Sequence, residues 1–228
     1  MTIHCYKGAV HGPENLTDAF AHSCNTAFSQ LGLDLGRSRL TDTARKMLFG
    51  EEMPTELLSS KSRWSLNASS DDVELVQTAF GQGKTLVTPF HMALIASAVA
   101  NRGILMKPYL IDHVENVSGD VISRTKPSAY RALLTEKEAS ELGELMKAVV
   151  NGGSASELSG RSYEVAGKTG SAEYVRSDGT IGTHSWFVGY TNTGEPDLVI
   201  AVIAEDGGAG STTAVPIASQ IFRSYYGE

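Results

Sequence analysis

A lysine, a hydroxyl residue and a glycine stand in a row in this 228-residue chain, and they are the residues best suited to do chemistry. Lys168 can supply positive charge, and the hydroxyl of Thr169 can hold a substrate carboxylate. Gly170 lets a substrate backbone lie close because it has no side chain. Ser171 adds a second hydroxyl. The stretches on both sides are rich in strand-forming residues, so these groups are expected on a strand edge, in an arrangement that suits acyl transfer.

A serine and an asparagine separated by one residue, Ser23 and Asn25, form a second group. Taken alone they indicate little, because both residue types are ordinary helix caps. Their order along the chain, ahead of the Lys-Thr-Gly run, is more specific. Ser-x-Asn and Lys-Thr-Gly belong to a motif set whose third member, Ser-x-x-Lys, carries an acyl-accepting serine.

The nucleophile pattern itself is not in its expected place. Ser123 and Lys126 have the Ser-x-x-Lys spacing, but they lie in a predicted strand that runs into Pro127. The pattern needs a helix N-terminus, where residues one turn apart share a face. Residues three apart in a strand point to opposite faces, so this copy is interpreted as a solvated hairpin end.

Two glycine-lysine pairs could indicate a phosphate-binding loop, and both fail the test. Such a loop needs a glycine five positions before the Gly-Lys pair. Thr78 stands there for the run at 81–85, and Ser162 for the pair at 167–168. Nucleotide binding is therefore not predicted.

Composition narrows the possible functions further. Hydrophobic residues make up 41% and charged residues 20%, which favours a packed core. The net charge of −7 and the lack of a basic cluster argue against a nucleic-acid partner. The apolar run at 92–100 is too short for a membrane span, which needs about 20 residues. The first residues do not resemble a signal peptide, so any export or anchoring segment is expected outside the chain.

Cysteine and histidine usage predicts neither a metal site nor a cofactor. Cys5 and Cys24 are the two cysteines, and the six histidines are scattered without metal-ligand spacing. Two cysteines do not define a redox compartment, and no disulfide between them is predicted. Cys24 is expected to pack as a small apolar residue.

The spacing of apolar residues and the positions of turn and capping residues predict one domain spanning 1–228, in which an antiparallel sheet is flanked by helices. This is an α/β chain of the α+β type. Residues 50–70 are interpreted as irregular. Helices are predicted at 17–31 (stopped by Gly32), 41–49, 88–101, 135–150 and 211–226, a hairpin at 109–117 and 121–126, and strands at 162–173, 183–191 and 197–205.

At this point the chain resembles a known family, the transpeptidase domains of bacterial class B penicillin-binding proteins. Residues 19–31 resemble the family's segment around its Ser-x-Asn motif, and residues 81–103 its buried central helix. Residues 166–190 resemble its Lys-Thr-Gly strand and the following His-x-Trp-Phe-x-Gly-Tyr strand. The resemblance covers most of the chain and implies a β-lactamase/transpeptidase-like fold.

The resemblance also implies roles for the motif residues. The substrate would be the D-Ala-D-Ala end of a peptidoglycan stem peptide, which β-lactam antibiotics mimic. Ser23 would relay a proton to the leaving amine with help from Lys168, and Asn25 would bind the substrate amide or orient the active-site lysine. Thr169 and Ser171 would hold the substrate carboxylate, and the Ser171 N–H would form half of an oxyanion hole. The substrate would lie along the strand edge at 168–173 as an added strand.

The resemblance departs at the front of the chain. The family places Ser-x-x-Lys before Ser-x-Asn, but none of the residues that precede Ser23 fits the pattern. The chain is therefore expected to be the C-terminal portion of such a domain, N-terminally incomplete and inactive alone. A non-catalytic sensor or interaction domain remains an alternative. A β-lactamase is the weaker one, since Glu51, Glu52 and Glu56 are candidates for its deacylating base by position only.

Two further expectations follow from the resemblance. The parent protein is expected at the extracytoplasmic face of the bacterial membrane. A sheet that lacks its first strands would expose an edge and apolar faces, including those of Trp186, Val188, Val199, Ala201 and Ile203. The chain is therefore expected to be stable only through self-association, strand exchange or pairing with the missing N-terminal part of the domain.

Overall fold

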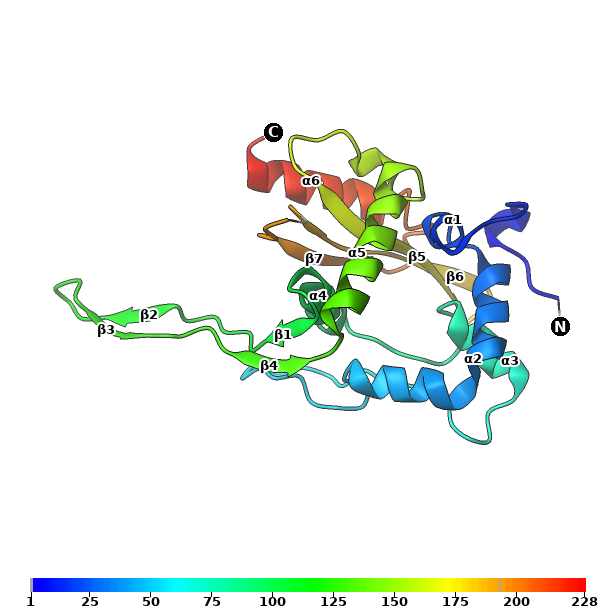
Figure 1. Cartoon of the computed structure of the whole chain (residues 1–228), viewed down its shortest axis with the longest axis horizontal. Coiled ribbons are helices and arrows are strands. Elements are labelled where there is room, and N and C mark those ends of the chain that lie inside the picture. Colours follow the sequence, from blue (N-terminus) through cyan, green and yellow to red (C-terminus); the bar gives the residue numbers. More distant parts are fainter. Residues whose placement is uncertain (1, 193) are drawn as a thin grey trace.

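The computed structural model describes residues 2–192 and 194–228 and combines helices with antiparallel strands (Figure 1). The helices are η1 (Tyr6–Gly8), α1 (Leu16–Ala21), α2 (Asn25–Lys46), α3 (Asp72–Ala79), α4 (Pro89–Ala100), α5 (Glu136–Asn151), η2 (Ser156–Leu158) and α6 (Ala214–Tyr226). The strands are β1 (Ile104–Met106), β2 (His113–Glu115), β3 (Val121–Arg124), β4 (Ala129–Ala132), β5 (Val165–Val175), β6 (Ile181–Thr191) and β7 (Val199–Ala204).

Strands β5, β6 and β7 form the central antiparallel sheet, in that order. Helix α6 packs on one face, where Phe187 and Phe222 are fully buried. Helices α4 and α5 pack on the other face, where Val99 and Met146 contact Tyr190. The sheet thus lies between two helical layers (Figure 1), as the sequence predicted.

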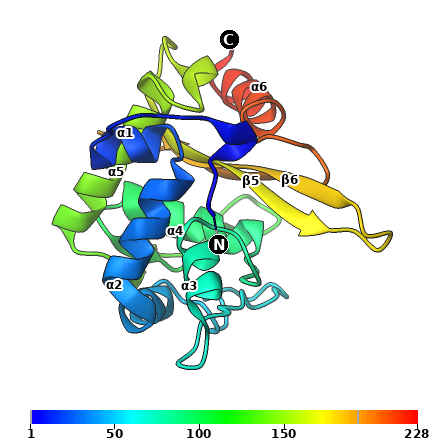
Figure 2. The ribbon, with the colours of Figure 1, turned by 90° about the vertical axis from the view of Figure 1, so that its right-hand side faces the viewer.

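Helices α2 and α3 lie side by side on the far side of α4 from α6 (Figures 1 and 2). Gly32 permits this contact, because a Cβ atom there would lie 2.3 Å from the Cβ of Ala79. The strands β2 and β3 pair as a hairpin that projects away from the rest of the molecule, and β1 pairs with β4 at its base (Figure 1).

The predicted helix at 17–31 is wrong in its boundaries. Helix α1 ends at Ala21, and α2 begins at Asn25 and continues through Gly32, which does not stop it. Gly32 is a helix interior residue here because its contact with α3 requires the absence of a side chain. The predicted helix at 41–49 is the last part of α2, which is kinked at Gly36, where φ is 77°.

The other predicted elements are confirmed with shifted ends. Thr88 caps α4 by accepting a hydrogen bond from the His91 N–H at 3.1 Å. Thr135 and Glu138 form the predicted capping box of α5. The hairpin, the three sheet strands and the last helix are present as β2–β3, β5–β7 and α6. Helix α3 and the short strands β1 and β4 were not predicted.

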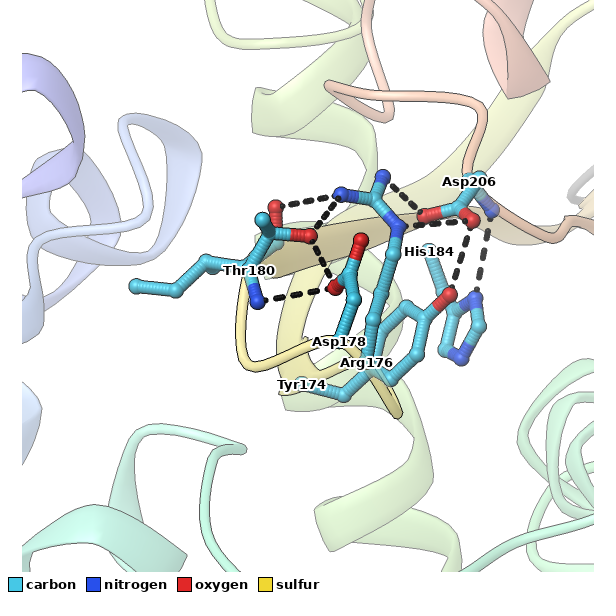
Figure 3. Close-up of polar contacts among 7 residues, drawn as sticks. Tyr174, Arg176, Asp178, Thr180, His184 and Asp206 are labelled. Atoms are coloured by element: carbon cyan, nitrogen blue, oxygen red, sulfur yellow. Dashed lines mark hydrogen bonds and ion pairs between the residues drawn. The ribbon is translucent and has the colours of Figure 1, made fainter.

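The far end of the β5–β6 hairpin is tied to the loop after β7 by a polar network (Figure 3). Both oxygens of Asp206 accept hydrogen bonds from the Arg176 guanidinium, at 2.7 and 3.1 Å. The Tyr174 hydroxyl donates to Asp206 at 2.8 Å, and its ring stacks on His184 with centroids 4.2 Å apart. The hydrogen bonds from Arg176 and Tyr174 hold the pKa of Asp206 below its usual range. This network fixes the loop at 205–213 against the hairpin.

One part of the sheet is covered poorly. Trp186 lies opposite Ile203, and Val188 opposite Ala201, on the face toward α4 and α5. All four side chains are only half-buried and belong to none of the buried clusters of the described residues. Within the described part of the chain, the outer edge of β7 has no partner strand.

We predict that the isolated chain self-associates, exchanges strands or pairs with an added segment that covers β7. Open strand edges and apolar patches favour such pairing. Analytical ultracentrifugation is expected to show species larger than a monomer, in a concentration-dependent distribution. A rigid monomer that unfolds cooperatively with nothing bound would contradict the prediction.

We predict that Gly32→Ala destabilises the chain, because the added methyl group would overlap Ala79 and force α2 away from α3. Overpacking of this kind costs about 1–3 kcal/mol of the free energy of unfolding. Urea denaturation followed by circular dichroism measures the loss. Arg39→Ala is the matched control on an exposed position of α2 and should leave the midpoint nearly unchanged.

Candidate active site

Ser23 lies in the tight turn between α1 and α2, in a conformation that few serines adopt. Its φ is 57°, in the left-handed region. The turn is closed by backbone bonds, since the Ser23 N–H donates to Phe20 O at 3.2 Å and the Cys24 N–H to Ala19 O at 2.8 Å. Strained backbone of this kind often marks a functional position. Here it directs the Ser23 side chain toward the sheet.

Lys168 on β5 joins this turn to the sheet. Its ammonium group donates a hydrogen bond to the Ser23 hydroxyl at 3.0 Å, across 145 positions of sequence. It also donates to Thr169 O at 2.9 Å and lies 5.7 Å from the centre of the Phe20 ring. Ser23 and Lys168, to which the resemblance assigned a shared proton relay, are therefore in direct contact.

The surroundings of Lys168 change its acidity. Removal of water from around the ammonium group lowers the pKa of Lys168 from 10.5 to about 8. Both protonation states are then accessible near neutral pH. A lysine poised in this way, within hydrogen-bond distance of a hydroxyl, can pass a proton to that hydroxyl and recover it.

Thr169 is held by a serine that the sequence did not single out. The hydroxyls of Thr169 and Ser154 are 2.5 Å apart. The Ser154 N–H in turn donates to Ala21 O at 3.1 Å, and a Cβ atom at Gly153 would lie 2.4 Å from that same oxygen. The loop after α5 therefore connects the end of α1 to the Lys-Thr-Gly strand. From the sequence, residues 151–153 were predicted only as the end of a helix.

Ser171 is oriented by the loop that the Figure 3 network anchors. Its hydroxyl accepts a hydrogen bond from the Gly210 N–H at 3.1 Å. Gly210 has to be a glycine, because a Cβ atom there would lie 2.6 Å from Gly170 O. Ser185 on β6 donates to Ala209 O at 2.9 Å and fixes the same loop. The two hydroxyls of Thr169 and Ser171 are thus positioned by separate parts of the chain.

Among the hydrogen bonds of the described residues, none joins Asn25 to Lys168. Asn25 is the first residue of α2, and its side-chain amide donates to His4 O at 3.0 Å. The structure therefore brings Ser23 to Lys168 and Thr169 on β5, which also carries Ser171, and binds Asn25 to the N-terminal segment. Sequence reasoning could not foresee this bond, because His4 lies in a segment without regular structure.

The two cysteines lie in the same N-terminal region. Their sulfur atoms are 3.8 Å apart, and both are free thiols. The ligand-type atoms of Cys5, His11 and Cys24 lie within 4.8 Å of one another, a grouping that spacing did not predict. Cys5 and Cys24 pack with Ala19 in a small buried cluster. As predicted, Cys24 packs as an apolar residue, and the cluster ties the N-terminal segment to the turn that carries Ser23.

A second residue that sequence reasoning missed lies on the open edge of β5. The Gln82 side chain donates to Ser171 O at 3.0 Å and accepts from the Glu173 N–H at 3.1 Å. The edge at 168–173, which was expected to be free for a substrate, is therefore partly occupied. Neither the glycine-lysine pair at 83–84 nor the resemblance of 81–103 to a central helix indicated a contact between Gln82 and β5.

Comparison with known proteins agrees with this geometry. A family model described as "Penicillin binding protein transpeptidase domain" matches residues 2–223. The chain belongs to this family. It is 31% identical over 227 residues to the peptidoglycan D,D-transpeptidase PbpA of Mycolicibacterium smegmatis, covering 95% of the chain and 45% of that protein. It is 27% identical to stage V sporulation protein D of Bacillus subtilis, covering 97% of the chain and 35% of that protein.

Solved structures show the same fold. Penicillin-binding protein A from M. tuberculosis, in an acyl-enzyme complex with ceftriaxone, superimposes with a TM-score of 0.83 at 30% identity. That match covers 93% of this chain and 49% of the other. The D,D-transpeptidase domain of a peptidoglycan glycosyltransferase from Eggerthella lenta gives a TM-score of 0.82 at 28% identity, over 95% and 55% of the two chains. The chain spans less than half the length of the curated relatives described above.

Among the described residues, no helix is both long and apolar enough to cross a membrane.

On the activity that the family resemblance implies, we predict that acylation of the full-length protein by penicillin G slows as the pH rises through about 8. The reason is that Lys168, with a pKa of about 8, loses the proton that it donates toward Ser23. Rapid-quench measurements of acyl-enzyme formation on both sides of this pH test it. In Lys168→Arg, whose guanidinium stays charged, the falling limb should be absent. A falling limb of the same midpoint in the arginine variant would show that another group titrates.

Proposed function

We propose that this chain is one part of a serine D,D-transpeptidase that cross-links peptidoglycan stem peptides and is acylated by β-lactams. The observation that carries the proposal is the 3.0 Å hydrogen bond between Lys168 and Ser23. It unites the Ser-x-Asn and Lys-Thr-Gly segments in one site, and the family match supports the reaction class. The whole of residues 1–228 is proposed to belong to one transpeptidase domain.

The covalent step needs a serine that residues 1–228 do not supply in a suitable setting. Ser123, the serine with Ser-x-x-Lys spacing, lies on β3 in the projecting hairpin. In the proposed reaction, a serine of the parent protein attacks the carbonyl carbon of the D-Ala-D-Ala amide while the lysine of its Ser-x-x-Lys pattern takes the hydroxyl proton, and the carbon–nitrogen bond breaks. The leaving amine takes a proton from the Ser23 hydroxyl, and Lys168 restores it. An amine of a second stem peptide then displaces the serine and forms the cross-link.

The other residues bind and orient the substrate in this proposal. Thr169 and Ser171 hydroxyls hold its carboxylate, and Gly170 permits close approach of its backbone. The Ser171 N–H stabilises the negative charge on the carbonyl oxygen, together with the N–H of the attacking serine. Asn25 binds the substrate amide or orients the active-site lysine. No cofactor takes part in these steps.

The location follows from the substrate. Peptidoglycan is assembled outside the cytoplasmic membrane, so the parent protein is proposed to act at the extracytoplasmic face of a bacterial cell. Its membrane anchor would then lie outside residues 1–228.

We predict that a fluorescent penicillin leaves no covalent label on residues 1–228 alone, because the acyl-accepting serine is absent. The full-length parent protein should be labelled, and the label should survive denaturation and gel electrophoresis. Mass spectrometry of a labelled peptide identifies the serine. Stable label on Ser23 or Ser123 of the isolated chain would mean that the nucleophile is misassigned. An unlabelled full-length protein would favour a non-catalytic binding domain.

A further inference from the structure

The outer edge of β5 is the surface on which an added strand would bind, and its polar groups are not equally available. In a strand, the N–H and C=O of one residue point the same way, and residues two apart share that direction. The bonds to Lys168 and Gln82 show that Thr169, Ser171 and Glu173 direct their backbone groups outward. Four of these groups form a row: Thr169 O, Ser171 N–H, Ser171 O and Glu173 N–H.

Side chains of the protein itself occupy three of the four. Lys168 donates to Thr169 O at 2.9 Å. The Gln82 amide spans the next gap, donating to Ser171 O at 3.0 Å and accepting from Glu173 N–H at 3.1 Å. One N–H and one C=O that pair with residues two apart on a strand take two backbone positions that an added strand would otherwise use. The Gln82 side chain therefore occupies part of the edge on which a peptide would bind.

A substrate needs the group that Gln82 occupies. In an antiparallel hydrogen-bonded pair, the residue whose C=O meets Ser171 N–H also directs its own N–H to Ser171 O. If Ser171 N–H receives the reacting carbonyl oxygen, the N–H of that same substrate residue must reach Ser171 O. In penicillin G, the acylamido N–H beside the lactam carbonyl is the equivalent donor. Gln82 Nε2 stands where this N–H has to go.

The loop that carries Gln82 permits its side chain to leave. The backbone is fixed, since the Gln82 N–H donates to Gln77 O at 2.8 Å at the end of α3. Gly81 and Gly83, with φ of 83° and 90°, make the turn that points Gln82 at β5. The side chain itself is half-buried and is held to β5 by two neutral hydrogen bonds, which are individually modest. A ligand N–H that bonds to Ser171 O replaces one of these bonds, and the other, from Glu173 N–H, is then left to water.

We propose that Gln82 is a specificity-determining residue that occupies Ser171 O on β5 and is displaced by ligands that supply an N–H to this oxygen. The proposal rests on the proposed transpeptidase function. It extends that function by assigning a selective role to Gln82. Ligands with an acylamido or peptide N–H form a hydrogen bond to Ser171 O when they displace Gln82, and ligands without such an N–H do not.

The test compares two β-lactams on the full-length parent protein. Penicillin G carries an acylamido group, whereas the carbapenem imipenem carries a hydroxyethyl group in its place. Acylation rate constants are measured by mass spectrometry for wild type, Gln82→Ala and Gln82→Glu, whose carboxylate cannot donate to Ser171 O. Lys84→Ala, an exposed position in the same loop, is the matched control.

The expected result is a rise in the penicillin-to-imipenem rate ratio of about threefold to tenfold in both Gln82 variants, because penicillin no longer competes with the glutamine for Ser171 O. The control should keep the wild-type ratio. Gln82→Asn, too short to span both bonds, should behave like Gln82→Ala and replaces it if the alanine variant does not fold.

Other outcomes overturn the proposal. An unchanged or lowered ratio in variants with the wild-type melting temperature would mean that Gln82 does not compete with ligand. An equal fall in both rates would show that Gln82 only supports the strand. If wild type is acylated by neither β-lactam, the proposed function itself fails, and the role of Gln82 falls with it.

Discussion

The hydrogen bonds of one partly buried ammonium group determine how the rest of the site is built. Lys168 loses hydration, which lowers its pKa to about 8. A charge in such a place needs polar partners close by, because an unpaired one would cost several kcal/mol. Its partners are the Ser23 hydroxyl and Thr169 O, with the Phe20 ring face nearby. Two of these belong to the α1 region and one to β5, so the ammonium group links the helical part of the chain to the sheet.

The contact between Lys168 and Ser23 constrains the conformation of the turns and loops around it. Ser23 reaches Lys168 only because the chain turns sharply between α1 and α2, with Ser23 in the left-handed conformation. The loop after α5 supports this turn, because its residues Gly153 and Ser154 contact Ala21. The same Ser154 contacts Thr169, so α1, α5 and β5 are joined through one small set of contacts. The polar network at the hairpin end acts in parallel, since it fixes the loop whose Gly210 positions Ser171.

Sequence patterns predicted the parts of this arrangement that depend on local interactions. Caps such as Thr88 and the box of Thr135 with Glu138 satisfy backbone groups within one turn, so they are visible in the sequence. The alternating strands around Lys168 were visible for the same reason. The break between α1 and α2 was not, because the helical spacing of apolar residues continues across Ser23. Gly32 was misinterpreted as a stop since only its contact with α3 reveals why it is a glycine. Ser154 and Gln82 act through partners far away in sequence, which no local pattern shows.

The two outer edges of the sheet differ in a way that fits their uses. A strand edge with unpaired backbone groups tends to pair with other chains, and proteins usually protect it. The β5 edge is protected by side chains of the protein itself, Lys168 and Gln82, which bond to groups that a partner strand would otherwise take. Side chains can move aside and return, so this protection is reversible, whereas a covering strand would block the edge permanently. The β7 edge has no such side-chain cover among the hydrogen bonds of the described residues, and half-buried apolar side chains lie beside it. Reversible cover suits an edge that binds and releases peptide, and an uncovered apolar edge suits lasting contact with further polypeptide.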